Sequence, residues 1–118
     1  MRDQLSRTPI YAAPALYEPF GLAVLEAALS GCALVLADIA SFRELWEGAA
    51  ALLDPYDPRA WISELNRLIS DEKSRIELAE RSRERAKRYT RIAMCARYYD
   101  LYRNLCAPTR GAPLEQAA

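Results

Sequence analysis

Two glutamates, Glu18 and Glu26, lie eight positions apart in the sequence. Glu18 comes just before an almost wholly apolar segment, and Glu26 lies inside that segment. From Phe20 to Leu29 every residue other than Glu26 is apolar or glycine, which predicts a buried core helix. An ionised carboxylate on such a helix is costly unless it is paired or faces a polar cavity. Glu26 therefore either forms a salt bridge with an arginine in the core or accepts hydrogen bonds from two hydroxyl groups of a ligand.

Glu18 directly precedes the predicted helix and follows a predicted strand. Open α/β sheets bind ligands beyond the carboxyl ends of their strands, which is where Glu18 would lie. Phe20, Gly21 and Leu22 would begin the helix, where unpaired backbone N–H groups and the helix dipole favour an anion such as phosphate. Gly21 lacks a side chain, so a ligand can approach the backbone closely. This combination suits a sugar, a diphosphate and a ribose, although Glu18 could also serve only to stabilise the helix start.

The elements that must position these residues alternate between strand and helix. Residues 9–13, 33–37 and 49–53 are short apolar runs, typical of strands that are covered on both faces. Residues 20–30 and the capping box at residues 41–44 predict the two helices that connect them. This order predicts an α/β fold, a partial Rossmann-like parallel sheet of about three strands with right-handed crossover helices.

From Asp57 onward the pattern is helical, and Asp57, Asp71 and Thr90 are the predicted N-caps of three successive helices. The last helix has no obvious partner within the chain. Its apolar residues follow a three-four spacing on one face: Ile92, Cys95, Tyr99, Tyr102 and Cys106.

Composition excludes several classes of function. The 118 residues include no histidine and only three, widely spaced cysteines, which argues against histidine-dependent catalysis, a disulfide framework and a zinc site. The charges balance at 16 basic and 16 acidic residues, and no nucleic-acid recognition motif is present. Residues 73–103 hold 10 Lys/Arg against 4 Asp/Glu, which indicates a solvated helix face, an acidic partner or anionic lipid. Without a spanning segment or signal core, we expect a cytoplasmic protein, with peripheral contact to the inner face of the membrane left open.

The run from Glu18 to Leu22, closed by Glu26 in a Glu-x7-Glu spacing, resembles the donor-site signature of retaining glycosyltransferases of the GT-B fold. The resemblance is to the family-four enzymes with the glycosyl transferases group 1 domain, and more distantly to glycogen and sucrose-phosphate synthases. It extends over residues 9–105 and implies the C-terminal half of a nucleotide-sugar-binding domain. Residues 1–8 are then a leader or a truncated upstream segment, and residues 106–118 are predicted to be a disordered tail.

The resemblance implies a role for each matching residue. Glu18 would hydrogen-bond hydroxyl groups of the donor sugar. The backbone of Phe20, Gly21 and Leu22 would contact the sugar and the diphosphate.

For the nucleotide, the resemblance implies that Glu26 holds the ribose hydroxyls and that Val24 and Leu25 line the pocket. The donor would be a UDP-, GDP- or ADP-hexose, and no metal or other cofactor is implied. No catalytic residue is assigned within this chain.

The sequence also departs from the family pattern. The arginine and lysine that clamp the diphosphate have no counterpart here, nor does the acceptor-binding N-terminal domain. Ala33 replaces a usual proline, and Ile39-Ala40 replaces a frequent glycine pair. We therefore expect a donor-binding fragment that is inactive alone and needs the acceptor domain or a partner chain. The alternative is a non-catalytic interaction module that docks through its basic, tyrosine-rich C-terminal helices, and self-association is a further expectation.

Overall fold

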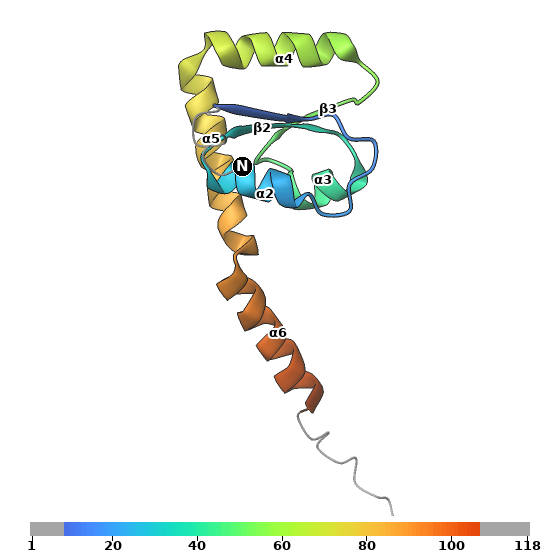
Figure 1. Cartoon of the computed structure of the whole chain (residues 1–118), viewed down its shortest axis with the longest axis vertical. Helices are drawn as coiled ribbons and strands as arrows, with labels where there is room; N and C mark the ends of the chain where they lie inside the picture. The colour runs from blue at the N-terminus through green and yellow to red at the C-terminus, as the bar shows by residue number, and fades with distance from the viewer. Residues whose placement is uncertain (1–8, 107–118) are drawn as a thin grey trace, which may run out of the picture.

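The computed structural model describes residues 9–106 of the chain, and Figure 1 shows their arrangement. Three strands form one parallel sheet in the order β1 (Ile10–Ala13), β2 (Ala33–Ala37) and β3 (Ala51–Leu53). The predicted parallel α/β architecture is confirmed. β3 begins two residues later than predicted, because Ala49 and Ala50 donate their N–H groups to Trp46 at the end of the preceding helix.

β2 is the centre of the core. It pairs with both neighbours, with Tyr11 opposite Leu34 and Leu36 opposite Leu52. All five of its residues are buried, as its continuous apolar sequence predicts for a strand covered on both faces.

Helices surround the sheet on two sides and at one end (Figure 1). The crossover helices α2 (Leu22–Leu29) and α3 (Ala40–Trp46) lie below the sheet, and α4 (Pro58–Ser70) lies above it. α5 (Glu72–Ala86) crosses the end where the strands begin. The carboxyl ends of the strands lie at the opposite end of the sheet, which no helix of residues 9–106 crosses in this way.

Side chains of α5 hold the loop that leads into β3. The buried Ser82 hydroxyl donates to the carbonyl of Ala49 at 2.7 Å, and Arg85 donates to the carbonyls of Leu45 and Glu47. These three carbonyls lie in the last turn of α3 and in the loop that follows it, so the bonds help to satisfy backbone oxygens near the end of a helix.

The three N-caps predicted for the C-terminal helices are confirmed. Asp57 accepts from the N–H groups of the first turn of α4, and Asp71 accepts from Ser74 in α5. Thr90 accepts from the N–H of Ala93 in the first turn of the last helix.

η1 (Lys87–Tyr89) and α6 (Arg91–Cys106) leave the sheet and project away from it (Figure 1). We call residues 87–106 the arm and residues 9–86 the body. No residue of the arm is buried, so the prediction that the last helix lacks a partner holds for the part of the chain that the structure describes.

Two predictions about the helices near the site were wrong. α2 begins at Leu22 and not at Phe20, because Gly21 adopts a left-handed conformation before it. Ser41 does not cap α3: the helix begins one residue earlier, Ile39 is its N-cap, and no side-chain cap bond forms.

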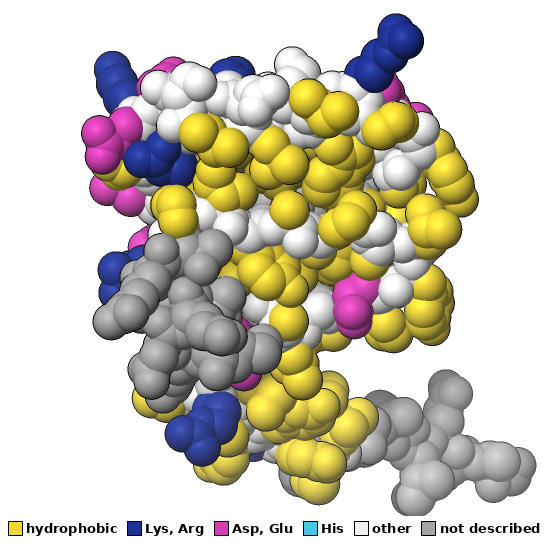
Figure 2. Space-filling view, turned by 45° about the horizontal axis from the view of Figure 1, so that its top comes forward, with side chains coloured by type: hydrophobic (Ala, Val, Ile, Leu, Met, Phe, Trp, Pro, Cys, Tyr) yellow, Lys and Arg dark blue, Asp and Glu magenta, His cyan; other side chains and the backbone are white. Residues whose placement is uncertain are grey.

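Figure 2 shows apolar side chains gathered on the face that lies below α4 in that view. Within residues 9–106, no helix is long and apolar enough to cross a bilayer. The predicted leader at residues 1–8 and the predicted tail beyond Cys106 lie outside the described residues. Cys106 itself is the last residue of α6 and not part of a tail.

Candidate functional site

The candidate site lies at the carboxyl ends of the strands, where three connections meet. These are the loop from Pro14 to Phe20 after β1, the pair Asp38-Ile39 after β2, and the turn that starts at Asp54 after β3. Parallel strands bring their carboxyl ends to one edge of the sheet, and Figure 1 shows these connections at the end opposite α5.

Glu18 is fixed in this loop by two hydrogen bonds. Its carboxylate Oε1 accepts from the N–H of Gly21 at 3.0 Å, and its backbone carbonyl accepts from the hydroxyl of Ser41. Burial raises the pKa of the Tyr11 hydroxyl on β1 above its ordinary value, and the negative charge of Glu18 raises it further. Glu18 thus has the structural role at the helix start that the sequence left open, while a carboxylate offers further lone pairs to a ligand.

Ser41 is a site residue that sequence reasoning missed. The capping-box pattern assigned its hydroxyl to its own helix, whereas the hydroxyl reaches a carbonyl 23 residues earlier. This bond ties the loop after β1 to α3, and no local sequence signal indicates it.

Gly21 is required by its conformation and by its surroundings. Its φ angle is +79°, which disfavours residues with a side chain. A Cβ at this position would lie 3.1 Å from Cε1 of Phe42 and 3.1 Å from Cγ2 of Val24. Its N–H donates to Glu18, so it is not the free amide that we predicted.

The unpaired amides belong instead to the first turn of α2. Leu22, Ala23 and Val24 occupy its first three positions, where N–H groups have no intrahelical acceptor, and no side chain caps the helix. Of the predicted residues Phe20, Gly21 and Leu22, only Leu22 belongs to this first turn, and anion binding by these amides stays a prediction.

α2 is buried on only one side. Val24, Ala27 and Ala28 pack in the core, whereas Leu22 is 69% exposed and Leu29 is 40% exposed. Glu26 lies on the exposed side, one turn after Leu22. The prediction of a buried core helix is therefore only partly right, because Leu22, Glu26 and Leu29 are exposed among the described residues.

Glu26 makes no salt bridge with any residue between Pro9 and Cys106. Since its side chain is exposed, it carries no desolvation cost that a core arginine would have to offset. Of the two interpretations that the sequence left open, the arginine pair is not formed in this part of the chain.

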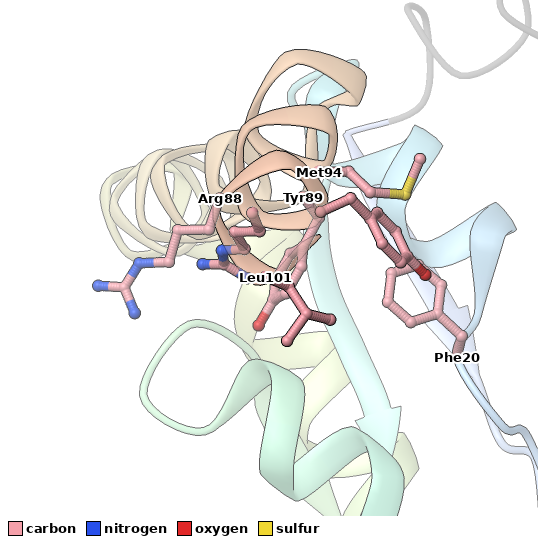
Figure 3. A pocket seen from close by; sticks show the side chains of 7 residues that line it. Phe20, Arg88, Tyr89, Met94 and Leu101 are labelled. Atoms are coloured by element: carbon pink, nitrogen blue, oxygen red, sulfur yellow. The ribbon is translucent and has the colours of Figure 1, made fainter. Parts of the chain in front are cut away.

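The other predicted pocket residues lie in different surroundings. The side chain of Val24 is 3% exposed and belongs to the core, so only its backbone can meet a ligand. Leu25 is half-buried and packs against the core. The ring of Phe20 faces Tyr89 of the arm at an edge-to-face angle, with 5.9 Å between ring centroids (Figure 3).

Asp38 is a second carboxylate at this edge of the sheet that the sequence did not single out. Its Oδ2 pairs with Arg43, and this hydrogen bond raises the pKa of the Arg43 guanidinium. Its Oδ1 is buried and has no hydrogen-bond partner among the described residues. The only signal in the sequence was the position of Asp38, directly after the buried strand β2.

A family model described as glycosyl transferases group 1 matches residues 2–88, which is more than half of the chain. The chain belongs to this family. The match covers the sheet, the candidate site and α5, and it ends before α6.

Curated members of the family are similar to this chain over most of its length. D-inositol 3-phosphate glycosyltransferase of Corynebacterium urealyticum is 35% identical over 91% of the chain, and that of Corynebacterium glutamicum is 33% identical over 83%. The matches cover only 26% and 24% of those two proteins, so this chain spans about a quarter of their length.

A solved structure shares the fold. Sucrose-phosphate synthase from Thermosynechococcus elongatus aligns with a TM-score of 0.78 and 26% identity, over 90% of this chain and 27% of that one. The resemblance to a GT-B glycosyltransferase is thereby confirmed for fold and family.

Proposed function

We propose that this chain supplies the donor-binding part of a glycosyltransferase that moves a hexosyl unit from a nucleotide-diphosphate sugar with retention of configuration. The observation that carries the proposal is the geometry of α2. Glu18 is fixed just before the helix, no side chain caps the first-turn amides, and the exposed Glu26 forms no salt bridge with any residue from Pro9 to Cys106.

The diphosphate would bind at the tip of α2. The amides of Leu22, Ala23 and Val24 and the positive end of the helix dipole favour an anion there. Gly21 is buried, with Phe42 and Val24 where its side chain would lie, so its role is to allow the left-handed turn that sets the start of the helix.

The sugar and the ribose would lie on opposite sides of the diphosphate. Glu18 would accept hydrogen bonds from the sugar hydroxyls through the lone pairs that Gly21 does not use. Glu26 is one turn along the helix from Leu22, so its carboxylate can accept from the two ribose hydroxyls. The exposed side chain of Leu22 would provide apolar contact to the nucleotide.

The amides would neutralise the diphosphate without a bound metal, helped by basic residues from outside this chain. Chelation with EDTA should therefore leave donor binding unchanged. A complete enzyme would also require an acceptor domain, so we expect no transfer by this chain alone. The cytoplasmic location inferred from the sequence stays a prediction.

Thermal unfolding with UDP-, GDP- and ADP-sugars near millimolar concentration tests the proposal. A ligand that binds only the folded state raises the unfolding midpoint by mass action. We expect one nucleotide class to raise it, Glu26→Gln to abolish the rise, and the control Glu44→Gln, exposed on α3, to retain it. A rise that Glu26→Gln leaves intact would contradict the site.

A second candidate function is docking to a separate protein through α5 and the arm. The exposure of every large apolar residue of α6 favours it. Capture of a partner chain that depends on α6 while no nucleotide sugar binds would support this function over donor binding.

A further inference from the structure

An apolar hollow lies between the arm and the loop before α2 (Figure 3). Its volume is about 410 Å³, which leaves room for large side chains. Phe20 contributes its ring here, whereas the family resemblance assigned only its backbone to the donor. The hollow is lined by Phe20, Arg88, Tyr89, Met94, Arg97, Tyr98 and Leu101.

The composition of the hollow is that of a protein interface. Tyrosine, methionine and arginine are the residue types enriched where proteins meet. A lipid surface is less suitable, because a membrane-bound helix separates its polar face from its apolar face. In α6, Arg91 lies one turn before Met94 and Cys95, so it interrupts the apolar side.

A complementary feature lies on the same chain, close to the hollow. Leu16 and Tyr17 form the tip of the loop after β1 and are 60% and 84% exposed, and the acidic Glu18 follows them. Leu16 stands four positions before Phe20, so the Cα atoms of these two residues lie within about 14 Å of each other. One surface thus carries both an apolar hollow with arginines and an apolar projection beside an acid. That is the self-complementarity that a two-fold dimer requires.

We propose that a second copy of this chain occupies the hollow. Leu16 and Tyr17 of each copy enter the hollow of the other, and the two contacts are related by a two-fold axis. This dimer does not depend on donor binding, so either proposal can fail without the other.

Charge favours the same occupant. The body, residues 9–86, holds 8 Lys/Arg against 13 Asp/Glu, whereas the arm, residues 87–106, holds 5 against 1. The body of one copy therefore attracts the arm of another, and added salt should weaken the dimer.

Light scattering coupled to size-exclusion chromatography, over a range of protein concentrations and without nucleotide sugar, tests the proposal. We expect the mass of a dimer for the unaltered chain. Leu16→Glu in the loop and Leu101→Glu in the hollow should each raise the dissociation constant at least about tenfold. The control Ile69→Glu, equally apolar and 64% exposed on α4, should leave it within about twofold.

A mixture of the two variants distinguishes this interface from any other. The Leu101→Glu chain keeps an intact loop and the Leu16→Glu chain keeps an intact hollow, so a mixed dimer retains one of the two contacts. The mixture should associate more strongly than either variant alone. A monomeric unaltered chain would overturn the proposal and leave the hollow to another part of a longer protein or to another protein. A dimer unaffected by both variants would also overturn it.

Discussion

The body and the arm differ in the burial of their apolar side chains. Every buried apolar residue of the described chain lies between Val24 and Ala86, and none lies between Lys87 and Cys106. The body is held together by its own core, whereas the arm is a helix with large apolar side chains in water. The family match ends at residue 88, close to the same boundary. Stability and donor binding should therefore depend on the body, and association should depend on the arm together with the exposed loop at Leu16 and Tyr17.

The largest expected effect is in the body. Phe42 is fully buried on α3, and Phe42→Ala should lower the free energy of unfolding by about 3–5 kcal/mol, because it removes packing and leaves a cavity. Urea unfolding followed by circular dichroism measures this loss. Tyr102→Ala, on the exposed arm, should change stability by less than about 0.5 kcal/mol. Equal losses for the two variants would contradict the division into body and arm.

A smaller loss is expected at the start of α2. Gly21→Ala places a Cβ at a φ of +79° and 3.1 Å from Phe42, which should cost about 1–3 kcal/mol. Gly48→Ala is the matched control, because its φ is +76° but no atom lies within 4 Å of the added Cβ. If both substitutions have the same cost in urea unfolding, the close packing at Gly21 contributes nothing.

The link from α5 to the sheet should contribute less again. Ser82→Ala leaves the buried carbonyl of Ala49 without the hydroxyl that donates to it, at a cost of about 1 kcal/mol. Ser70→Ala, which removes an exposed hydroxyl bonded within α4, is the control and should be near neutral. A shift in the urea midpoint for Ser82→Ala no larger than the control's would show that this bond does not stabilise the body.

The smallest expected effect is the pH dependence of the stability that Asp71 contributes. Hydrogen bonds from the Ser74 hydroxyl and backbone N–H hold the pKa of Asp71 below its ordinary value. A lowered folded-state pKa stabilises the protein above the unfolded pKa, and this contribution is lost as pH falls through the folded value. Asp71→Asn should therefore lower the thermal midpoint at pH 7 more than at about pH 3. A difference that is constant with pH would contradict this account.

Patterns that depend on short stretches of sequence predicted much of this fold. The buried run at β2 and the caps at Asp57, Asp71 and Thr90 are local, and the structure has them as predicted. The missing partner of α6 could also be read from its own stripe of apolar residues.

The details of the site could not be predicted in the same way. Ser41 bonds to Glu18 across 23 residues, and the left-handed Gly21 moves the helix start by two positions. The exposure of Glu26 depends on what covers α2, which its own apolar sequence does not indicate. Tertiary contacts decide each of these features.

The most direct test of the account is a map of amide chemical shifts by nuclear magnetic resonance. A ¹⁵N-labelled chain would be titrated with the nucleotide sugar that raises its unfolding midpoint. We predict that the largest shifts occur at Leu22, Ala23 and Val24, with smaller ones at Gly21 and Glu26 and none along α6. Shifts confined to α6, or the absence of any shift at the start of α2, would contradict donor binding at this helix.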